Sequence, residues 1–440
     1  MEMTRNAGRV GAEQAELQFA DITGALKSVF VPIRRLKEIL AGSEWFDGSA
    51  IEGATRELES DMYLRPDLET FNVSSSSVDP RSVRFICDVV QPDGTPYLGD
   101  CRSTLRRIVD QSRDAGLDYL VAPEVEFFLF PADSEDPGPT GGGGGYFERS
   151  RGRSRQVEQQ IASTLEAMGI QIRSSHHEVG TGQFELDLPL REALWTADAV
   201  ATLKPAVKDV AGSFGLRATF MPKPLTDSPG SGMHTHQIAL LKDGTNAFQD
   251  AEAPYGLSTI GRRFAAGQLH HASGMAALLA PLVNSYKRLV PGFEAPIAGS
   301  WGRHNRSALI RVPTPATASA TSFDDIGTRL ELRLPDPACN PYLAFAAMLT
   351  AGLDGLDSEL EIGPPMEELD HGVEFGPKLS VRPLPTSLAD ALIALEDDDV
   401  ITASLGSALV GIYLAAKRLE WDSYRRQVTP WERAAYFDQA

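Results

Sequence analysis

Four short segments of the chain alternate strictly between apolar residues and side chains that bind metals or phosphates. Their polar positions are Glu124 and Glu126, Glu185 and Asp187, His234 and His236, and Arg329, Glu331 and Arg333. A period of two places every second side chain on one face of a β-strand, so each segment predicts a strand with a charged face. A half-buried strand with its polar face in water explains any one segment taken alone. Together they indicate a common site, because carboxylates this close to one another require a cation.

The residue types in this set favour a hard divalent cation. Five glutamates and one histidine supply mainly oxygen ligands: Glu124, Glu126, Glu178, Glu185, Glu331 and His234. Such a set suits Mg²⁺ or Mn²⁺ better than zinc, and two cations could be held. The arginines are not metal ligands, but they match phosphate and carboxylate oxygens. Cations and arginines in one cavity indicate phosphoryl transfer from a nucleotide.

The charge of the chain excludes other classes of protein. Its 440 residues carry 41 Lys+Arg and 60 Asp+Glu, a net charge of −19, and the pI is near 4.9. This balance argues against a nucleic-acid partner. The apolar runs are shorter than the roughly 20 residues of a membrane span, and the polar N-terminus does not resemble a signal or transit peptide. We therefore expect a cytoplasmic protein without a membrane partner, whose 3 cysteines are small buried residues.

Local patterns divide the chain into a small strand-rich unit and a larger mixed unit, with a boundary near residue 102. Residues 1–14 predict a flexible polar tail. Further elements are expected as strands at 17–22, 28–32 and 83–90, a short helix at 33–40, a helix at 102–115 before a strand at 119–130, and a helix at 157–169 before a strand at 170–172. The glycine run at 141–145 is not followed by the Lys of a P-loop, so it predicts a surface loop.

Long motifs follow one another from about residue 15 to the C-terminus in the order and spacing of one enzyme family. They are FDGS at 46–49, PEVEF at 123–127, HHEVGTGQ at 176–183, FMPKP at 220–224, GSGMHTHQ at 230–237, NSYKRLVPGFEAP at 284–296, NRSALIR at 305–311 and RLELRLPDP at 329–337. On these residues the chain resembles the class I glutamine synthetases. The resemblance implies an α+β fold with a small N-terminal β-grasp domain (15–102) and a large catalytic domain (103–440), whose curved antiparallel sheet is flanked by helices. It also implies hexameric rings stacked into a dodecamer, with each active site formed between neighbouring subunits.

The resemblance further implies a role for individual residues. One metal would be held by Glu126, Glu178 and Glu185, and a second by Glu124, His234 and Glu331. Substrate glutamate would be bound by Gly230, Arg288 and Arg333, and ATP by His236, Arg306, Arg311 and Arg329. Three residues would act in catalysis: Asp47 of the neighbouring subunit as the base for ammonium, Glu294 as a flap over the acyl phosphate, and Arg306. Tyr146 matches a tyrosine of the ammonium site.

The other histidines receive no ligand role. His176 and His177 are predicted to be structural, since the adjacent Glu178 carries that role. His270 and His271 end a helix-like stretch and are expected to interact with the helix dipole.

The chain departs from the family pattern at four places. Pro229 precedes Gly230 where an asparagine is usual, so an amide beside the glutamate pocket is lost. Ala50 replaces a serine next to the ammonium base, and ERSRGRSR at 148–155 replaces an apolar segment. Ile238 stands where a serine often lies near the nucleotide. The segment after residue 365 also lacks the motif of a nucleotidylated tyrosine, so control by that modification is not expected.

Three functions are consistent with these residues. The first is ATP-dependent ligation of ammonia to the side-chain carboxylate of L-glutamate through γ-glutamyl phosphate, giving glutamine, ADP and phosphate. Retention of Asp47 and Glu294 favours it. The second is a glutamate–amine ligase acting on ethanolamine, a polyamine or another primary amine, which Ala50 and the altered loop favour. The third is a non-catalytic structural member, which would not need to retain the metal ligands and arginines.

Overall fold

The computed structural model describes residues 2–9, 11–51, 60–73, 82–133, 145–150, 152–315, 327–367 and 382–439. The predicted glycine loop lies outside these residues except for Gly145, and so does most of the segment in which the nucleotidylation motif was sought.

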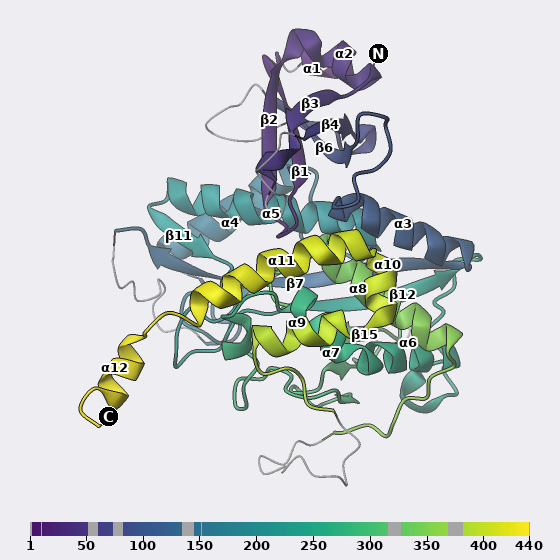
Figure 1. Cartoon of the computed structure of the whole chain (residues 1–440), viewed down its shortest axis with the longest axis vertical. Coiled ribbons are helices and arrows are strands. Elements are labelled where there is room, and N and C mark those ends of the chain that lie inside the picture. Colours follow the sequence, from purple (N-terminus) through teal and green to yellow (C-terminus); the bar gives the residue numbers. More distant parts are fainter. Residues whose placement is uncertain are drawn as a thin grey trace.

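The N-terminal unit is a small twisted sheet with short helices (Figure 1). Its elements are α1 (Glu2–Arg9), β1 (Gln14–Ala20), β2 (Leu26–Pro32), η1 (Ile33–Arg35), α2 (Leu36–Ala41), β3 (Glu44–Asp47), η2 (Gly48–Ala50), β4 (Asp61–Pro66), η3 (Leu68–Thr70), β5 (Asn72–Val73) and β6 (Ser82–Val90). The strand order is β2-β1-β6-β4-β3, and β5 pairs with β6. Strands β1 and β6 are parallel, whereas the other pairs are antiparallel.

One difference from the sequence-based expectation lies at the N-terminus. Residues 1–14 were expected to form a flexible tail, but α1 occupies Glu2–Arg9 and β1 already begins at Gln14. Ala7 packs into the core of the N-terminal unit with Leu17 and Phe85. The tail is therefore a helix that contacts the core through Met3 and Ala7, too few apolar residues to give a recognisable pattern.

The second unit is built on a larger sheet. Its strands are β7 (Leu117–Pro131), β8 (Ser174–His177), β9 (Gln183–Asp187), β10 (Arg191–Glu192), β11 (Leu216–Thr219), β12 (Met233–Leu241), β13 (Trp301–Gly302), β14 (Ile310–Arg311) and β15 (Leu330–Leu332). The main order is β13-β14-β15-β12-β7-β9-β8, and β10 and β11 also pair with β7. All neighbours are antiparallel except β13 and β14. The α+β class is confirmed, with one parallel pair added to the antiparallel sheet.

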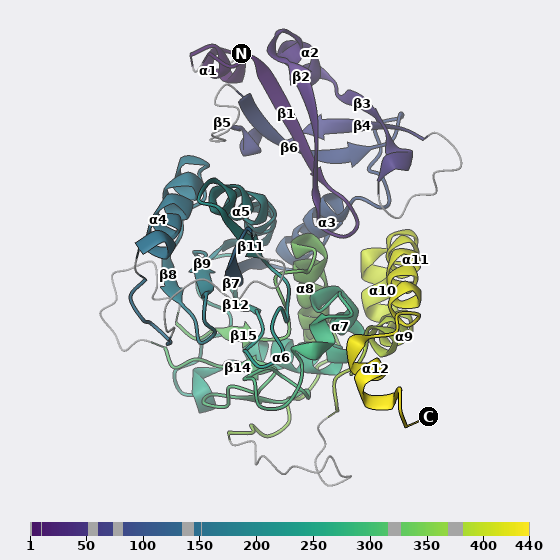
Figure 2. The same cartoon turned by 90° about the vertical axis from the view of Figure 1, so that its left-hand side faces the viewer.

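Helices cover this sheet and form an outer layer. They are α3 (Cys101–Asp114), α4 (Gly152–Ala167), α5 (Ala193–Ser213), α6 (Thr259–His270), α7 (Ala272–Leu279), α8 (Pro341–Asp357), α9 (Leu388–Glu396), α10 (Asp399–Leu405), α11 (Ser407–Tyr424) and α12 (Pro430–Tyr436), with the short η4 (Pro254–Gly256) and η5 (Ser285–Lys287). Figure 2 shows α4 and α5 beneath the N-terminal unit, and α9 to α11 beyond α7 and α8. The helix at α8 is buried on nearly all sides, which explains its continuous apolar sequence.

The predicted strand at 170–172 is wrong. The structure has no strand there, and pairing with β9 begins only at Ser174. Ile170 instead packs into the core of the larger unit, and Ile172 lies against it. A short apolar run of this kind fits a buried loop as well as a strand.

A buried arginine joins the two units. The guanidinium group of Arg102 of α3 lies 2.8 Å from Asp67, 2.7 Å from Asp88 and 2.8 Å from Asp198. Arg102 is only 2% exposed. Asp88 belongs to β6 of the small sheet, and Asp198 belongs to α5. The arginine therefore connects the small sheet to the helices that support the cavity described below.

No single helix in the described ranges is both long and apolar enough to span a membrane. By length and composition alone, α10 and α11 together pass such a test, although they are bent by 107°.

His271 links three helices and supplies a pH-dependent contribution to stability. Its Nδ1 lies 2.8 Å from Asp398 and its Nε2 3.0 Å from Asp354, so from the C-terminal end of α6 it pairs with aspartates of two other segments. Burial alone would lower the pKa of His271, but the hydrogen bonds to Asp398 and Asp354 outweigh it and raise the pKa.

We predict that His271→Gln lowers the free energy of unfolding by about 2 kcal/mol at pH 6, where the wild-type ring is charged in both states. Because the folded-state pKa is raised, this contribution is fully present below the unfolded pKa of about 6.5 and is lost as pH rises through the folded-state pKa. Urea unfolding at pH 6 and pH 9 measures it. His304→Gln, at an exposed position, is the control. An equal loss at both pH values would contradict the assigned charge.

Candidate active site

A cavity of about 650 Å³ opens over one face of the large sheet. The predicted site residues that line it are Glu124, Glu126, Tyr146, Glu178, Glu185, Gly230, His234, His236, Arg288, Glu294, Arg306, Arg311, Arg329, Glu331 and Arg333. Asp47 does not line it. The structure therefore brings together residues from β7, β9, β12, β14, β15 and the intervening loops.

The strand register explains how the charged side chains meet. His234 of β12 lies opposite Glu124 of β7, and His236 lies opposite Glu331 of β15. On the other side of β7, Glu126 lies opposite Glu185 of β9. Since directly opposite residues share a face of the sheet, the alternating segments present their polar side chains to the same cavity.

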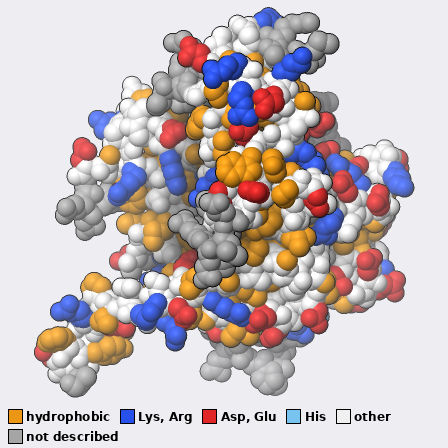
Figure 3. Space-filling view, turned by 45° about the horizontal axis from the view of Figure 1, so that its top comes forward, with side chains coloured by type: hydrophobic (Ala, Val, Ile, Leu, Met, Phe, Trp, Pro, Cys, Tyr) orange, Lys and Arg blue, Asp and Glu red, His pale blue; other side chains and the backbone are white. Residues whose placement is uncertain are grey.

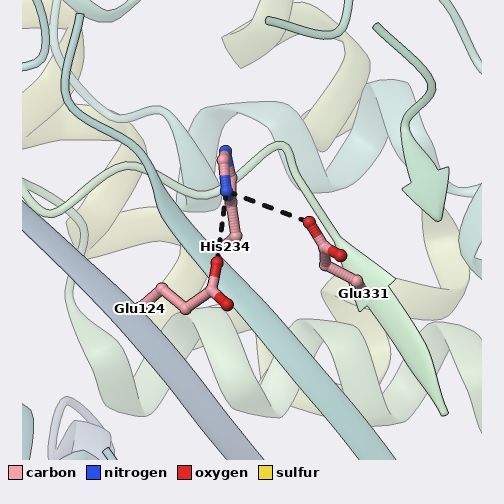
Figure 4. A group of neighbouring side chains, drawn as sticks. All are labelled: Glu124, His234 and Glu331. Atoms are coloured by element: carbon pink, nitrogen blue, oxygen red, sulfur yellow. Dashed lines mark ion pairs between the residues drawn. The ribbon is translucent and has the colours of Figure 1, made fainter. Parts of the chain in front are cut away.

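Glu124, His234 and Glu331 form the first cluster of ligand atoms (Figure 4). His234 lies between the two carboxylates, with its Nδ1 3.5 Å from Glu124 and 3.9 Å from Glu331. Their potential ligand atoms all lie within 4.8 Å of one another. Burial and the nearby Arg333 lower the pKa of His234 to about 4, so its ring is neutral and able to ligate a metal.

The carboxylates of this cluster are already compensated by the protein. Burial opposes their charge, but His236 and His234 hold the pKa of Glu124 well below its usual range, and His236 and Arg333 lower the pKa of Glu331. Glu331 lies 2.5 Å from Arg311 and 2.6 Å from Arg333. Both carboxylates are therefore ionised at neutral pH.

The acidic residues on the β8–β9 side of the cavity are not compensated in this way. Burial and the neighbouring Glu178 raise the pKa of Glu126 to about 8, and burial with Glu124 and Glu126 raises that of Glu185 to about 12. Burial also raises the pKa of Glu178. At neutral pH Glu126 and Glu185 therefore hold protons unless a cation replaces them.

The closest cluster on this side differs from the predicted set. It contains His176, Glu185 and Asp187, whereas the resemblance implied Glu126, Glu178 and Glu185. His176 Nε2 lies 3.1 Å from Glu185, while Glu126 accepts a hydrogen bond of 2.7 Å from Gln183. Sequence reasoning treated His176 as structural and gave Asp187 no ligand role. The signal was present, because both residues stand at alternating positions of paired strands.

The donor set fits divalent cations. The carboxylates supply oxygens, His234 supplies one neutral nitrogen, and the uncompensated acids need positive charge. Asp187 Oδ1 is buried and has no hydrogen-bond partner among the described residues. An unsatisfied buried carboxylate oxygen beside other carboxylates is consistent with a site completed by a cation.

The arginines of the cavity donate hydrogen bonds to backbone carbonyl oxygens and to other side chains of the site. Arg288 is 3% exposed and donates to the carbonyl oxygens of Leu334 and Arg333, each at 3.0 Å. Arg329 donates to His236 at 3.2 Å, and His236 Nε2 lies 2.8 Å from Glu124. Nδ1 of His236 thus faces Arg329, and its Nε2 faces Glu124. The guanidinium groups of Arg288 and Arg329 are thus held at the cavity before any ligand enters.

Gly230 lies where a side chain has no space. A Cβ at this position would lie 2.4 Å from the carbonyl oxygen of Pro222 and 2.9 Å from Arg288. The absent side chain lets the backbone of Gly230 approach the cavity beside Arg288. This position suits binding of a substrate by main-chain groups.

Glu294 lies on an exposed loop at the mouth of the cavity. Its φ of 55° is in the left-handed region, which is strained for a non-glycine residue. Its carboxylate lies 3.0 Å from Arg306, and its carbonyl oxygen accepts a hydrogen bond of 3.2 Å from Arg333. The Arg306 guanidinium in turn lies 6.0 Å from the ring of Tyr146. The three side chains form one side of the opening.

Asp47 lies at the end of β3 in the N-terminal unit. Its carboxylate accepts hydrogen bonds from the backbone N–H and the hydroxyl of Ser49, at 3.0 Å and 2.9 Å. Those bonds lower its pKa. Within one chain Asp47 is separate from the cavity, so its predicted role needs a second subunit.

A second cavity of about 430 Å³ adjoins the first. It shares Arg173, His236 and Arg329 with the first cavity, and its apolar lining includes Ile172 and Leu190. The sequence does not reveal this cavity, because its lining combines α4, β7 and β12 with loop residues that have no periodic pattern.

The four departures from the family pattern fall in different surroundings. Pro229 lines the first cavity, beside Gly230. Ile238 is buried in the core and lines neither cavity. Arg151 of the altered loop at 148–155 lies outside the described residues. The side chain of Ala50, which is a separate departure, also lies outside them. Pro229 is therefore the departure that the structure places at the site.

Comparison with known proteins agrees with this architecture. The sequence matches the family description "Glutamine synthetase, beta-Grasp domain" over residues 11–92 and "Glutamine synthetase, catalytic domain" over residues 98–436. It is 46% identical to glutamine synthetase of Thermus thermophilus and 43% identical to that of Staphylococcus aureus strain MW2; each alignment covers 96% of this chain and 94% of the relative. A solved structure titled "GmaS/ADP complex-Conformation 1" has a TM-score of 0.88 at 32% identity and covers 99% of both chains.

We predict that Mn²⁺ binding strengthens with pH. Because Glu126 has a pKa of about 8, a cation at neutral pH must displace its proton, so the apparent affinity should rise about tenfold between pH 6.5 and pH 8. The electron spin resonance signal of free Mn²⁺ measures this. Glu126→Gln should weaken binding and flatten the pH dependence, whereas Glu148→Gln, outside the cavity, should change neither. Equal pH dependence in Glu126→Gln would contradict the assignment.

Proposed function

The chain belongs to the glutamine synthetase family and is an ATP-dependent ligase, and from this premise we propose that it joins ammonia to the side-chain carboxylate of L-glutamate. The reaction would pass through γ-glutamyl phosphate and give glutamine, ADP and phosphate. The observation that carries the proposal is the cavity in which two clusters of acidic ligands lie beside five arginines, of which Arg288 and Arg333 are buried.

The residues of the cavity match the demands of this reaction. A carboxylate is a poor electrophile until one oxygen becomes a leaving group, which transfer of the γ-phosphoryl group of ATP provides. Enzymes of this family use ATP and divalent metals, and we propose that Glu126, Glu178 and Glu185 hold one cation, with His176 and Asp187 adjacent, while Glu124, His234 and Glu331 hold another. Bound Mg²⁺ or Mn²⁺ would neutralise the phosphate oxygens.

The arginines divide between the two substrates. Arg288 and Arg333 lie beside Gly230 and His234, so we assign them to the carboxylates of glutamate. Arg306, Arg311 and Arg329 line the rest of the cavity and are assigned to the phosphates, with His236. Their guanidinium groups stabilise the negative charge that develops during transfer.

The second cavity suits the base and sugar of the nucleotide. Its apolar lining can pack against a planar ring, while His236 and Arg329 at the junction face the phosphate side. The similar structure that contains ADP in its title supports a nucleotide site in this fold.

The second step requires a proton acceptor and exclusion of water. Asp47 of a neighbouring subunit would take a proton from ammonium at the opening formed by Tyr146, and Glu294 would close over the acyl phosphate. Rings of six subunits, stacked in pairs, would bring a second chain to each cavity. In support, α12 projects from the body (Figure 1) and exposes hydrophobic side chains (Figure 3): Trp431 at 67%, Tyr436 at 53% and Phe437 at 74%.

A second candidate is ligation of glutamate to a larger primary amine, such as ethanolamine or a polyamine. The specific observation that favours it is Pro229 in the lining of the cavity, since it alters the surroundings of Gly230. A non-catalytic role is not retained, because such a role would not account for the ordered arginines and acids.

Phosphate release from ATP distinguishes the two candidates. With glutamate and Mg²⁺ or Mn²⁺ present, we expect ammonium to support turnover more efficiently than ethanolamine, putrescine or aniline. Mass spectrometry of the product identifies the amide. Turnover with one of the amines and none with ammonium would replace the first proposal by the second.

We predict that Glu294→Ala uncouples the two steps. The intermediate would be exposed to water, so the ratio of phosphate released to amide formed should rise about tenfold. Glu359→Ala is a matched control, because Glu359 also has a positive φ, of 50°, and pairs with Arg263 at 3.0 Å. It should leave the ratio unchanged. An unaltered ratio in Glu294→Ala would count against the flap role.

A further inference from the structure

We propose that Lys223 is a positioning residue that holds the 291–296 loop, and with it Glu294, over the cavity by packing its ammonium group against the ring of Phe293. The proposal rests on the function proposed above for what the loop does during turnover. The contact itself is a property of the free protein and is tested separately.

The backbone of Lys223 is fixed on the side of the amino-acid pocket. Its N–H donates to Asn284 Oδ1 at 2.8 Å, and Asn284 Nδ2 donates back to the carbonyl oxygen of Lys223 at 3.0 Å. Asn284 directly precedes η5, which ends next to Arg288. Lys223 is thus anchored to the same segment that carries a substrate-binding arginine.

The side chain of Lys223 has an unusual pair of partners. It is 8% exposed, its Nζ donates to the carbonyl oxygen of Ser228 at 2.5 Å, and Nζ lies 3.4 Å from the centre of the Phe293 ring. Among the described residues, no carboxylate forms an ion pair with it. Burial lowers the pKa of Lys223 and the charge of Asp227 opposes this only in part, so the ammonium group is costly to bury. The face of the Phe293 ring supplies further negative potential at 3.4 Å.

Phe293 is the residue of the 291–296 loop whose side chain Lys223 contacts. It directly precedes Glu294 in the chain and is partly buried, whereas Gly292 and Glu294 on either side are exposed. The other side-chain pair of the loop joins Glu294 to Arg306, and these side chains are 54% and 59% exposed. An exposed ion pair contributes little to fixing a loop, so among the side-chain pairs of the loop the Lys223–Phe293 contact is the stronger restraint, beside the hydrogen bond from Arg333 to the Glu294 carbonyl oxygen.

The same lysine reaches the segment that departs from the family pattern. Ser228, whose carbonyl oxygen accepts from Lys223, immediately precedes Pro229 and Gly230. Ser231 N–H also donates to the carbonyl oxygen of Pro222 at 2.8 Å, next to Lys223 in the chain. Lys223 therefore connects the wall of the substrate pocket to the loop at its mouth. A displacement of the wall should displace the loop, and a displacement of the loop should displace the wall.

Hydrogen exchange of the whole unliganded protein tests the contact. In Lys223→Met, which removes the charge and keeps an apolar chain, exchange in a peptide covering 290–295 should accelerate at least about fivefold relative to the wild type. Lys223→Arg keeps a cation over the ring and should stay within about twofold. Phe293→Leu should behave like Lys223→Met, and Phe293→Tyr like the wild type. Exchange in α8 is the internal reference.

Turnover gives the second readout. In Lys223→Met the ratio of phosphate to amide should rise about fivefold and the KM for the acceptor should increase, while the rate of glutamate-dependent phosphate release changes less than about twofold. The double variant with Phe293→Leu should be no worse than either single variant. A purely structural role of Lys223 would instead lower all rates together, without rescue by arginine.

The outcomes separate this proposal from the proposed function. If no amide is formed with any acceptor, the exchange experiment still decides whether Lys223 holds the loop. If exchange of 290–295 is unchanged in both Lys223→Met and Phe293→Leu, or is accelerated equally by Lys223→Arg, the proposal is wrong. If Lys223→Met fails to fold, Phe293→Leu and Phe293→Tyr decide alone, because Phe293 lies on a surface loop.

Discussion

The concentration of carboxyl groups on one face of a sheet is the constraint around which the larger unit is organised. Buried like charges repel, and the protein meets this cost in two different ways. Around Glu331 and Glu124 it supplies arginines and histidines, so these acids are ionised in the free protein. Around Glu126 and Glu185 the contacts with Gln183 and His176 do not offset burial and the neighbouring acids, and these two carboxyl groups retain protons at neutral pH. In one half of the cavity the acids are thus ionised before a ligand binds. In the other half the ionisation of the acids depends on the ligand.

Much of this arrangement could be predicted from the sequence. Alternation identifies which side chains share a face of each strand, and the polar residues of all four segments lie at the cavity or in its acidic cluster. Alternation cannot identify which strands are neighbours. His236 and Glu124 are 112 positions apart, and only the resemblance to a family supplied their proximity before the fold was known. The strand expected at 170–172 fails because Ile170 packs into the core of the larger unit and does not pair with a neighbouring strand. The contacts of His176 with Glu185 and of His271 with Asp354 and Asp398 likewise join residues that no local pattern relates.

Other features depend on contacts that no local pattern encodes. Lys223 stands in a segment rich in proline, where its sequence neighbours give no indication of a partner. Its partner Phe293 lies far along the chain. The second cavity similarly combines a loop with a strand edge. Asp47 belongs to the N-terminal unit and does not line the cavity of its own chain, which no pattern around residue 47 indicates.

The register of the strands limits how such a protein can change during evolution. Insertion or deletion of a single residue within β7, β9, β12 or β15 would exchange the two faces of that strand, and would turn acids into the core and leucines toward the substrate. New acceptor preferences must therefore arise where length and composition are free to vary, in the connections around the opening. Segments such as 148–155 and the neighbourhood of Pro229 are the parts of the molecule in which relatives with one chemistry can diverge in what they accept.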